Sequence, residues 1–136
     1  MSEEDRLQQL APVFRPVAAL VLGQVRTMLA VHSGNAYEAV VMTAWRSHLQ
    51  QKKAFDAGAS KALPGRSPHN VMTASGVPAS LAIDIAITEP DSRPGAKFPR
   101  KYVGGTHPVW GLIPAAAWVI CQQDEVLPDY WLRSGS

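Results

Sequence analysis

The sequence contains little that would cross-link, anchor or export the chain. Its single cysteine, Cys121, excludes an internal disulfide framework, and we expect a buried, unreactive thiol because it follows the apolar run 115–120. The apolar stretch 17–22 is much shorter than the roughly 20 residues that a membrane span requires. The first six residues are acidic and polar, unlike the basic start of a secretory signal. We therefore expect a cytoplasmic origin with no signal peptide and no membrane span.

Charge is sparse as well. Charged residues make up 18% of the chain and the formal net charge is +2, with no run of Lys and Arg that would form a basic stripe, so no nucleic-acid partner is expected. The weak excess of cations permits attraction to an anionic polymer such as a bacterial cell wall, although a solvated surface is the preferred explanation. With 136 residues and 46% hydrophobic residues, the chain has the size and composition of a single globular domain, residues 1–136.

Three segments have the pattern of helices. Apolar residues recur at steps of three, four and seven from Leu7 to Met28. Because Pro16 has no N–H to donate, we expect a short first piece and a main helix from near Pro16 to the Ser33-Gly34 pair. Residues 46–58 read as an exposed helix that ends at a glycine, and residues 110–120 read as an apolar helix in spite of an internal proline.

Two apolar runs, residues 38–45 and 80–87, have the composition of strands. Between them, residues 59–78 are rich in Ser, Gly, Pro and Asn and predict a long irregular loop, and residues 88–106 predict another. Loops of this length without structure of their own are uncommon in compact domains and are usually functional or disordered. The chemistry of the chain is therefore expected near these loops.

Five short motifs follow one another in a fixed order between residues 38 and 87. They are Ala44-Trp45-Arg46-Ser47, then Gln51 and Phe55, then Gly58 with Ser60-Lys61, then Gly65-Arg66-Ser67-Pro68-His69-Asn70, and Pro78-Ala79-Ser80-Leu81-Ala82-Ile83-Asp84. In order and spacing this set resembles the L-alanyl-D-glutamate and D-alanyl-D-alanine peptidases, zinc enzymes that cleave peptidoglycan and include many phage endolysins. One such motif occurs by chance in many proteins, whereas the five together are specific.

The resemblance implies an α+β fold, with a small antiparallel sheet and flanking helices, and a Zn²⁺ ion held by His69 and Asp84. It also implies that Arg46 stabilises the oxyanion that forms when water attacks a peptide carbonyl. Ser67 and Gln51 resemble positions that hold the loop or the substrate peptide. The expected substrates are the stem peptides of bacterial peptidoglycan, and the expected place of action is the cell wall or a virion, after synthesis in the host cytoplasm.

The chain departs from the family's pattern in two places. Val71 to Pro78 form an insertion of about eight residues between the two ligands, which costs little chain entropy. The family's closing Asp-x-x-His has its counterpart in Asp129-Tyr130-Trp131-Leu132, so Asp129 takes the position of the general base and Leu132 that of the third zinc ligand. Leucine cannot bind zinc, and catalytic zinc usually has three protein ligands. His107, after a Gly-Gly turn, is the candidate for the third.

Three functions are therefore compatible with the sequence. The first is a zinc metallopeptidase that hydrolyses peptidoglycan. The second is a degenerate copy of that fold, which binds cell wall or contacts structural proteins of a phage particle, because function depends on the site and not on the fold. The third is an interaction domain unrelated to zinc, with Trp110, Tyr130 and Trp131 as its binding surface.

Overall fold

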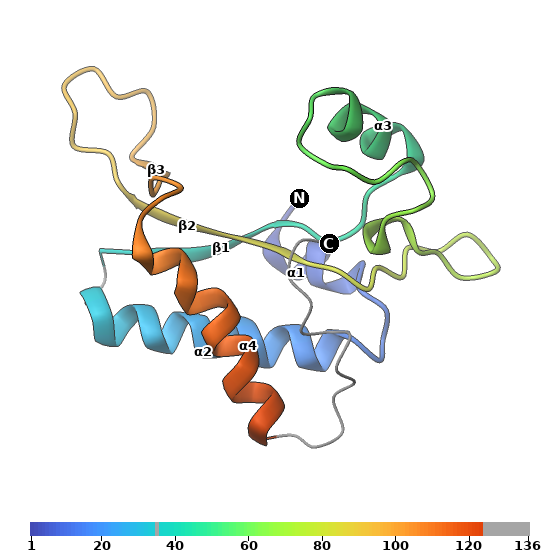
Figure 1. Cartoon of the computed structure of the whole chain (residues 1–136), viewed down its shortest axis with the longest axis horizontal. Helices are drawn as coiled ribbons and strands as arrows, with labels where there is room; N and C mark the ends of the chain where they lie inside the picture. Colours follow the sequence, from blue (N-terminus) through green and yellow to red (C-terminus); the bar gives the residue numbers. More distant parts are fainter. Residues whose placement is uncertain (35, 124–136) are drawn as a thin grey trace. The chain divides into compact units, whose positions relative to one another are not determined.

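The computed structural model describes residues 1–34 and 36–123, which form four α-helices, two short 3-10 helices and a three-stranded antiparallel sheet (Figure 1). The expected α+β class is thereby confirmed. In chain order the elements are α1 (Glu3–Gln8), α2 (Arg15–Ser33), β1 (Glu38–Thr43), α3 (His48–Asp56), η1 (Pro68–Asn70), β2 (Asp84–Pro90), β3 (Arg100–Tyr102), η2 (Pro108–Gly111) and α4 (Leu112–Gln123).

The described residues divide into two compact units. The first contains residues 1–18 and 41–84, and the second contains residues 19–40 and 85–123. Each unit has apolar side chains that are almost fully buried. In the first unit these are Leu10, Ala11, Phe14, Ala18, Val41, Ala44, Ala79 and Ala82, and in the second they are Leu22, Val25, Leu29, Ala39, Ala86, Ile87, Val103, Val109, Ala116 and Ile120. No described helix is long and apolar enough to cross a membrane.

Local sequence signals fix the helices of the first unit. Ser2 and Ser47 begin α1 and α3 with capping boxes, in which the serine hydroxyl accepts from the third helical N–H and the side chain of that third residue bonds back to the serine N–H. Gly58, just after α3, has φ +77°, a conformation that other residues rarely adopt. Beyond α1, the main chain of Leu10 forms a parallel bridge with Ser80.

The second unit contains most of α2, most of β2, all of β3 and the apolar helix α4. β2 pairs with β3 in antiparallel register, with Thr88 opposite Tyr102, and the connection between them extends beyond the strands (Figure 1). In α4, Pro114 is the third helical residue, where the missing N–H would lack an intrahelical partner anyway. The predicted helix therefore forms in spite of its proline, because Pro114 lies in the first turn and not in the helix interior.

The structure corrects two boundaries. The strand predicted from Ser80 begins only at Asp84, because Ser80 bonds instead to Gln9 and Ala11: its N–H donates to the Gln9 carbonyl at 2.9 Å, and its carbonyl accepts from the Ala11 N–H at 2.8 Å. The prediction of an uninterrupted loop over residues 88–106 was wrong, since β2 runs to Pro90 and β3 lies within that stretch. Both errors come from pairing between distant segments, which local composition does not reveal.

The loop between β2 and β3 contains a carboxylate with an altered acidity. Arg93 donates two side-chain hydrogen bonds to Asp91, at 2.9 and 2.7 Å, and these bonds lower the pKa of Asp91 from 3.8 to about 2. A carboxyl whose folded pKa is depressed contributes stability that is fully present above its ordinary pKa and is lost as the pH falls toward the folded value. The contribution should therefore be present above about pH 4 and disappear toward about pH 2.

We expect Arg93→Ala to return the pKa of Asp91 toward 3.8, measured by NMR titration of the carboxyl group. Because Arg93 is exposed, added salt should reduce the difference between the variant and the parent. Lys97→Ala, an exposed cation of the same loop, serves as the matched control and should leave the titration of Asp91 unchanged. An Asp91 that titrates alike in the parent and in Arg93→Ala would contradict the assignment.

Candidate functional site

The loop that carries His69 is held rigidly from both sides. Ser67 begins η1, and its hydroxyl accepts from the His69 N–H at 3.2 Å. The buried Asn70 side chain accepts from the Gly65 and Ser67 N–H groups, at 3.1 and 3.2 Å, and donates to the Arg46 carbonyl at 2.9 Å. These hydrogen bonds connect the loop to the segment that follows β1. They hold the backbone of His69, from which the ring extends, in place.

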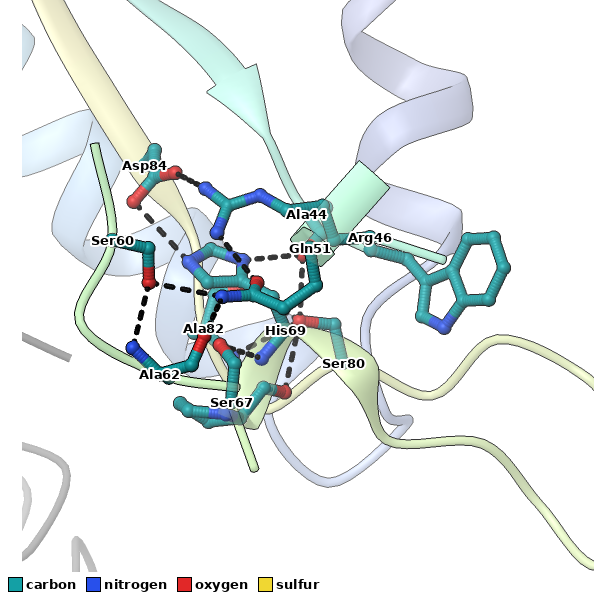
Figure 2. A network of polar contacts seen from close by, with 12 residues as sticks. Ala44, Arg46, Gln51, Ser60, Ala62, Ser67, His69, Ser80, Ala82 and Asp84 are labelled. Carbon is teal, nitrogen blue, oxygen red and sulfur yellow. Dashed lines mark hydrogen bonds and ion pairs between the residues drawn. The ribbon is translucent and has the colours of Figure 1, made fainter. Parts of the chain in front are cut away.

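The imidazole of His69 is oriented by the end of β1. It is 1% exposed, and its Nδ1 lies 2.7 Å from the Ala44 carbonyl oxygen (Figure 2). A carbonyl oxygen only accepts, so Nδ1 must carry the proton, and in the neutral ring Nε2 keeps a free lone pair. Nε2 is buried and has no hydrogen-bond partner. The ring thus directs an unsatisfied nitrogen into the site.

That nitrogen faces Asp84. His69 Nε2 and Asp84 Oδ1 are 3.3 Å apart, which is an ion-pair separation if the ring is protonated, although the pair lacks the geometry of a hydrogen bond. With the neutral ring both atoms are electron-pair donors and no proton lies between them. Two lone pairs that face each other repel, so this contact is favourable only when a proton or a metal cation lies between the two atoms.

The spacing of the two atoms fits zinc. Zinc bonds to imidazole nitrogen and carboxylate oxygen are about 2.0 to 2.2 Å long, and at a tetrahedral angle two such ligand atoms lie roughly 3.3 to 3.5 Å apart. The observed 3.3 Å agrees with this separation. A metal-ligating histidine usually donates its other ring N–H to a carbonyl or carboxylate, as the Nδ1 of His69 does to Ala44. The two side chains therefore suit a zinc ion in the separation of their ligand atoms and in outer-shell support.

The second oxygen of Asp84 is engaged by Arg46. The guanidinium donates to Asp84 Oδ2 at 2.9 Å and to the buried Gln51 Oε1 at 2.9 Å, and the Arg46 side chain is 19% exposed (Figure 2). Gln51 in turn donates to the Ser60 hydroxyl at 2.9 Å and to the Ala62 carbonyl at 2.8 Å. A chain of hydrogen bonds thus links the loop after α3 to the carboxylate.

Gln51 should matter for stability because it is fully buried and all its polar atoms are used. We expect Gln51→Ala to lower the free energy of unfolding by about 1 to 3 kcal/mol, since the Ala62 carbonyl and the Arg46 guanidinium lose a partner. Denaturant titration measures the change. The matched control is Gln8→Ala, an exposed glutamine that bonds Glu4 within α1, where the cost should stay below about 0.5 kcal/mol. Equal losses in both variants would contradict the role of Gln51.

Of the residues that the sequence predicts for the site, the structure brings together His69, Asp84, Arg46, Gln51 and Ser67. Gln51 and Ser67 are both buried, and the hydrogen bonds of their side chains are with the protein; their assignment to substrate binding stays a prediction. Asp129 lies outside the described residues, as does Leu132.

His107 belongs to the second unit, and both its ring nitrogens have contacts there. Nδ1 accepts from the Val109 N–H at 3.0 Å, which caps η2, and Nε2 lies 3.3 Å from the Tyr37 hydroxyl. Its assignment as a third zinc ligand stays a prediction. Within residues 1–34 and 36–123, no group of three or more His, Cys, Asp or Glu side chains is arranged to hold a metal ion.

Sequence reasoning missed three groups that shape the site: the Ala44 carbonyl, the Asn70 amide and the Ser80 hydroxyl. The Ala44 carbonyl accepts from His69 and also from Ser80, at 2.7 and 2.8 Å. Asn70 and Ser80 stand within the motifs that carry the resemblance, so their positions were visible but their contacts were not. A backbone carbonyl has no sequence signal at all.

No protein-family model, curated protein or solved structure matches the chain.

Proposed function

We propose that this chain is a zinc-dependent peptidase that hydrolyses peptide bonds of bacterial peptidoglycan, of the phage endolysin or virion-associated lysin type. One observation carries the proposal: the buried, unpartnered Nε2 of His69 faces Asp84 Oδ1 at a separation that suits two zinc ligands. The substrate class rests on the resemblance of the five motifs, and the pair of side chains supports the metal chemistry that the resemblance implies.

In the proposed function each residue of the candidate site has its own role. His69 and Asp84 would hold the zinc ion, which when bound supplies a Lewis acid for peptide hydrolysis. Arg46 places a fixed positive charge beside the ligand carboxylate, where it stabilises negative charge that develops on a peptide oxygen. Gln51 holds the guanidinium in place, and Asp129 is the proposed general base.

A degenerate peptidase fold with a structural or wall-binding role is the second candidate, and the contact between Arg46 and Asp84 favours it. A guanidinium 2.9 Å from Asp84 Oδ2 neutralises the carboxylate that would attract a cation. The same contact stabilises the described residues without any metal, as an ion pair that joins the segment after β1 to the start of β2.

Metal analysis together with an activity assay separates the two candidates. The peptidase should contain about one zinc ion per chain after purification in zinc-containing buffer, and it should release amino groups from purified peptidoglycan in a reaction that a chelator stops and zinc restores. A chain without zinc and without activity at micromolar concentration would reject the peptidase, and retained binding to insoluble peptidoglycan would then support the degenerate fold.

A further inference from the structure

Ser80 lies where the segments that carry the two proposed ligands come together. The residue is fully buried, and its hydroxyl is 2.8 Å from the Ala44 carbonyl oxygen, 2.7 Å from that of Ala82 and 3.5 Å from that of Pro68 (Figure 2). The same oxygen accepts from the Ala82 N–H at 3.1 Å. A hydroxyl has one proton, so it is shared between the two nearer carbonyls.

The two nearer carbonyls, those of Ala44 and Ala82, are each connected to one of the proposed ligands. The Ala44 oxygen accepts the Nδ1 proton of His69, and Ala82 stands two residues before Asp84. The backbone repeats the connection, because the Leu81 N–H donates to the Pro68 carbonyl at 3.0 Å. The buried Ser80 side chain therefore contacts both the residue that orients the imidazole and the segment that leads to the carboxylate.

We propose that Ser80 is a positioning residue that holds the Ala44 carbonyl against Nδ1 of His69 and thereby sets the orientation of the ring and its separation from Asp84. If the hydroxyl is removed, residue 80 no longer connects the Ala44 carbonyl to the segment that leads to Asp84. The Ala44 oxygen then loses one of its two donors and part of its fixed direction, and the hydrogen bond to Nδ1 loosens. The part of the inference that concerns metal affinity rests on the proposed function, whereas the ring geometry does not.

Nitrogen NMR of the isotope-labelled full chain, without added metal, tests the geometry. In the parent, the ring of His69 should show one dominant tautomer with the proton on Nδ1. Ser80→Ala should lower the fraction of that tautomer and speed the exchange of the ring proton with water. Ser75→Ala is the matched control, since it removes an exposed hydroxyl that contacts Thr73 and not Ala44, and it should leave the ring signals as in the parent.

A Ser80→Ala chain with the ring signals of the parent overturns the proposal. If that variant does not fold, Ser80→Thr decides, because it keeps the hydroxyl: a folded threonine variant should retain the Nδ1–H signal, and its loss there overturns the proposal as well.

Zinc titration by calorimetry tests the consequence for the site. Ser80→Ala should bind zinc chloride ten- to a hundredfold more weakly than the parent, as is usual when an outer-shell partner is removed, and Ser75→Ala should stay within about twofold. Unchanged affinity in Ser80→Ala would overturn this part. A parent chain that binds no zinc refutes the proposed function instead, and the NMR comparison still decides the role of Ser80.

Discussion

Replacing His69 by alanine should weaken zinc binding by more than about a hundredfold. Removing an outer-shell partner of a metal site typically costs ten- to a hundredfold in affinity, and His69 is a proposed ligand itself, with its unpartnered Nε2 3.3 Å from Asp84 Oδ1. Calorimetric titration with zinc chloride measures the loss. Circular dichroism of the variant should be that of a folded chain, because the Ala44 carbonyl keeps the Ser80 hydroxyl as a donor.

His48→Ala is the control for that experiment. His48 is exposed at the first position of α3 in the same unit, so its removal should change zinc affinity by less than about twofold. If His69→Ala binds zinc as tightly as the parent, the assignment of the metal site is wrong. If both variants lose affinity equally, the loss is not specific to His69 and the assignment of the metal site is wrong as well.

Arg46→Ala should lower the rate of peptidoglycan hydrolysis by about a hundred- to a thousandfold, the usual effect of removing one preorganised donor to an oxyanion. It should also lower the free energy of unfolding by about 1 to 3 kcal/mol, because Gln51 Oε1 stays buried without a partner. The two effects are separable, since turnover is measured at saturating substrate well below the unfolding temperature.

The matched variant is Arg46→Lys. Lysine keeps the positive charge but lacks the planar fork that bonds Gln51 and Asp84 together, so part of the stability should return while turnover stays low. Full activity in Arg46→Ala would reject the role at the reacting oxygen. Full activity in Arg46→Lys would show that charge alone matters and that the hydrogen-bond geometry does not.

The sequence predicts the helices well because their signals are local. The helix predicted from near Pro16 to Ser33-Gly34 is observed as Arg15–Ser33, and the segment predicted over 46–58 is observed as His48–Asp56, with serine capping at its start. The strands are predicted less well, since their ends depend on partners. β3 has only three residues, Arg100–Tyr102, and its composition does not suggest a strand; it exists because Tyr102 pairs with Thr88.

The candidate site shows the same contrast between features that local sequence reveals and contacts that depend on distant residues. His69, Asp84 and Arg46 are predicted from the resemblance of the five motifs, because the order and spacing of those motifs are specific. The contacts that orient them are not found, since one is a main-chain oxygen, at Ala44, and another is the hydroxyl of Ser80, which bonds residues far away in the sequence. Prediction from sequence therefore reaches the candidate site residues and stops before the contacts that orient them.

The bridge between Leu10 and Ser80 also constrains the order in which the chain acquires its structure during synthesis. The Gln9 carbonyl and the Ala11 N–H bond the backbone of Ser80, about seventy positions later, so these two groups lack that partner until Ser80 has left the ribosome. Closing so long a loop has an entropic cost that grows only slowly with length, but contacts of this separation slow the search for the folded state. A nascent chain halted before residue 80 therefore cannot close the first unit, and it exposes Leu10, which is fully buried in the finished protein.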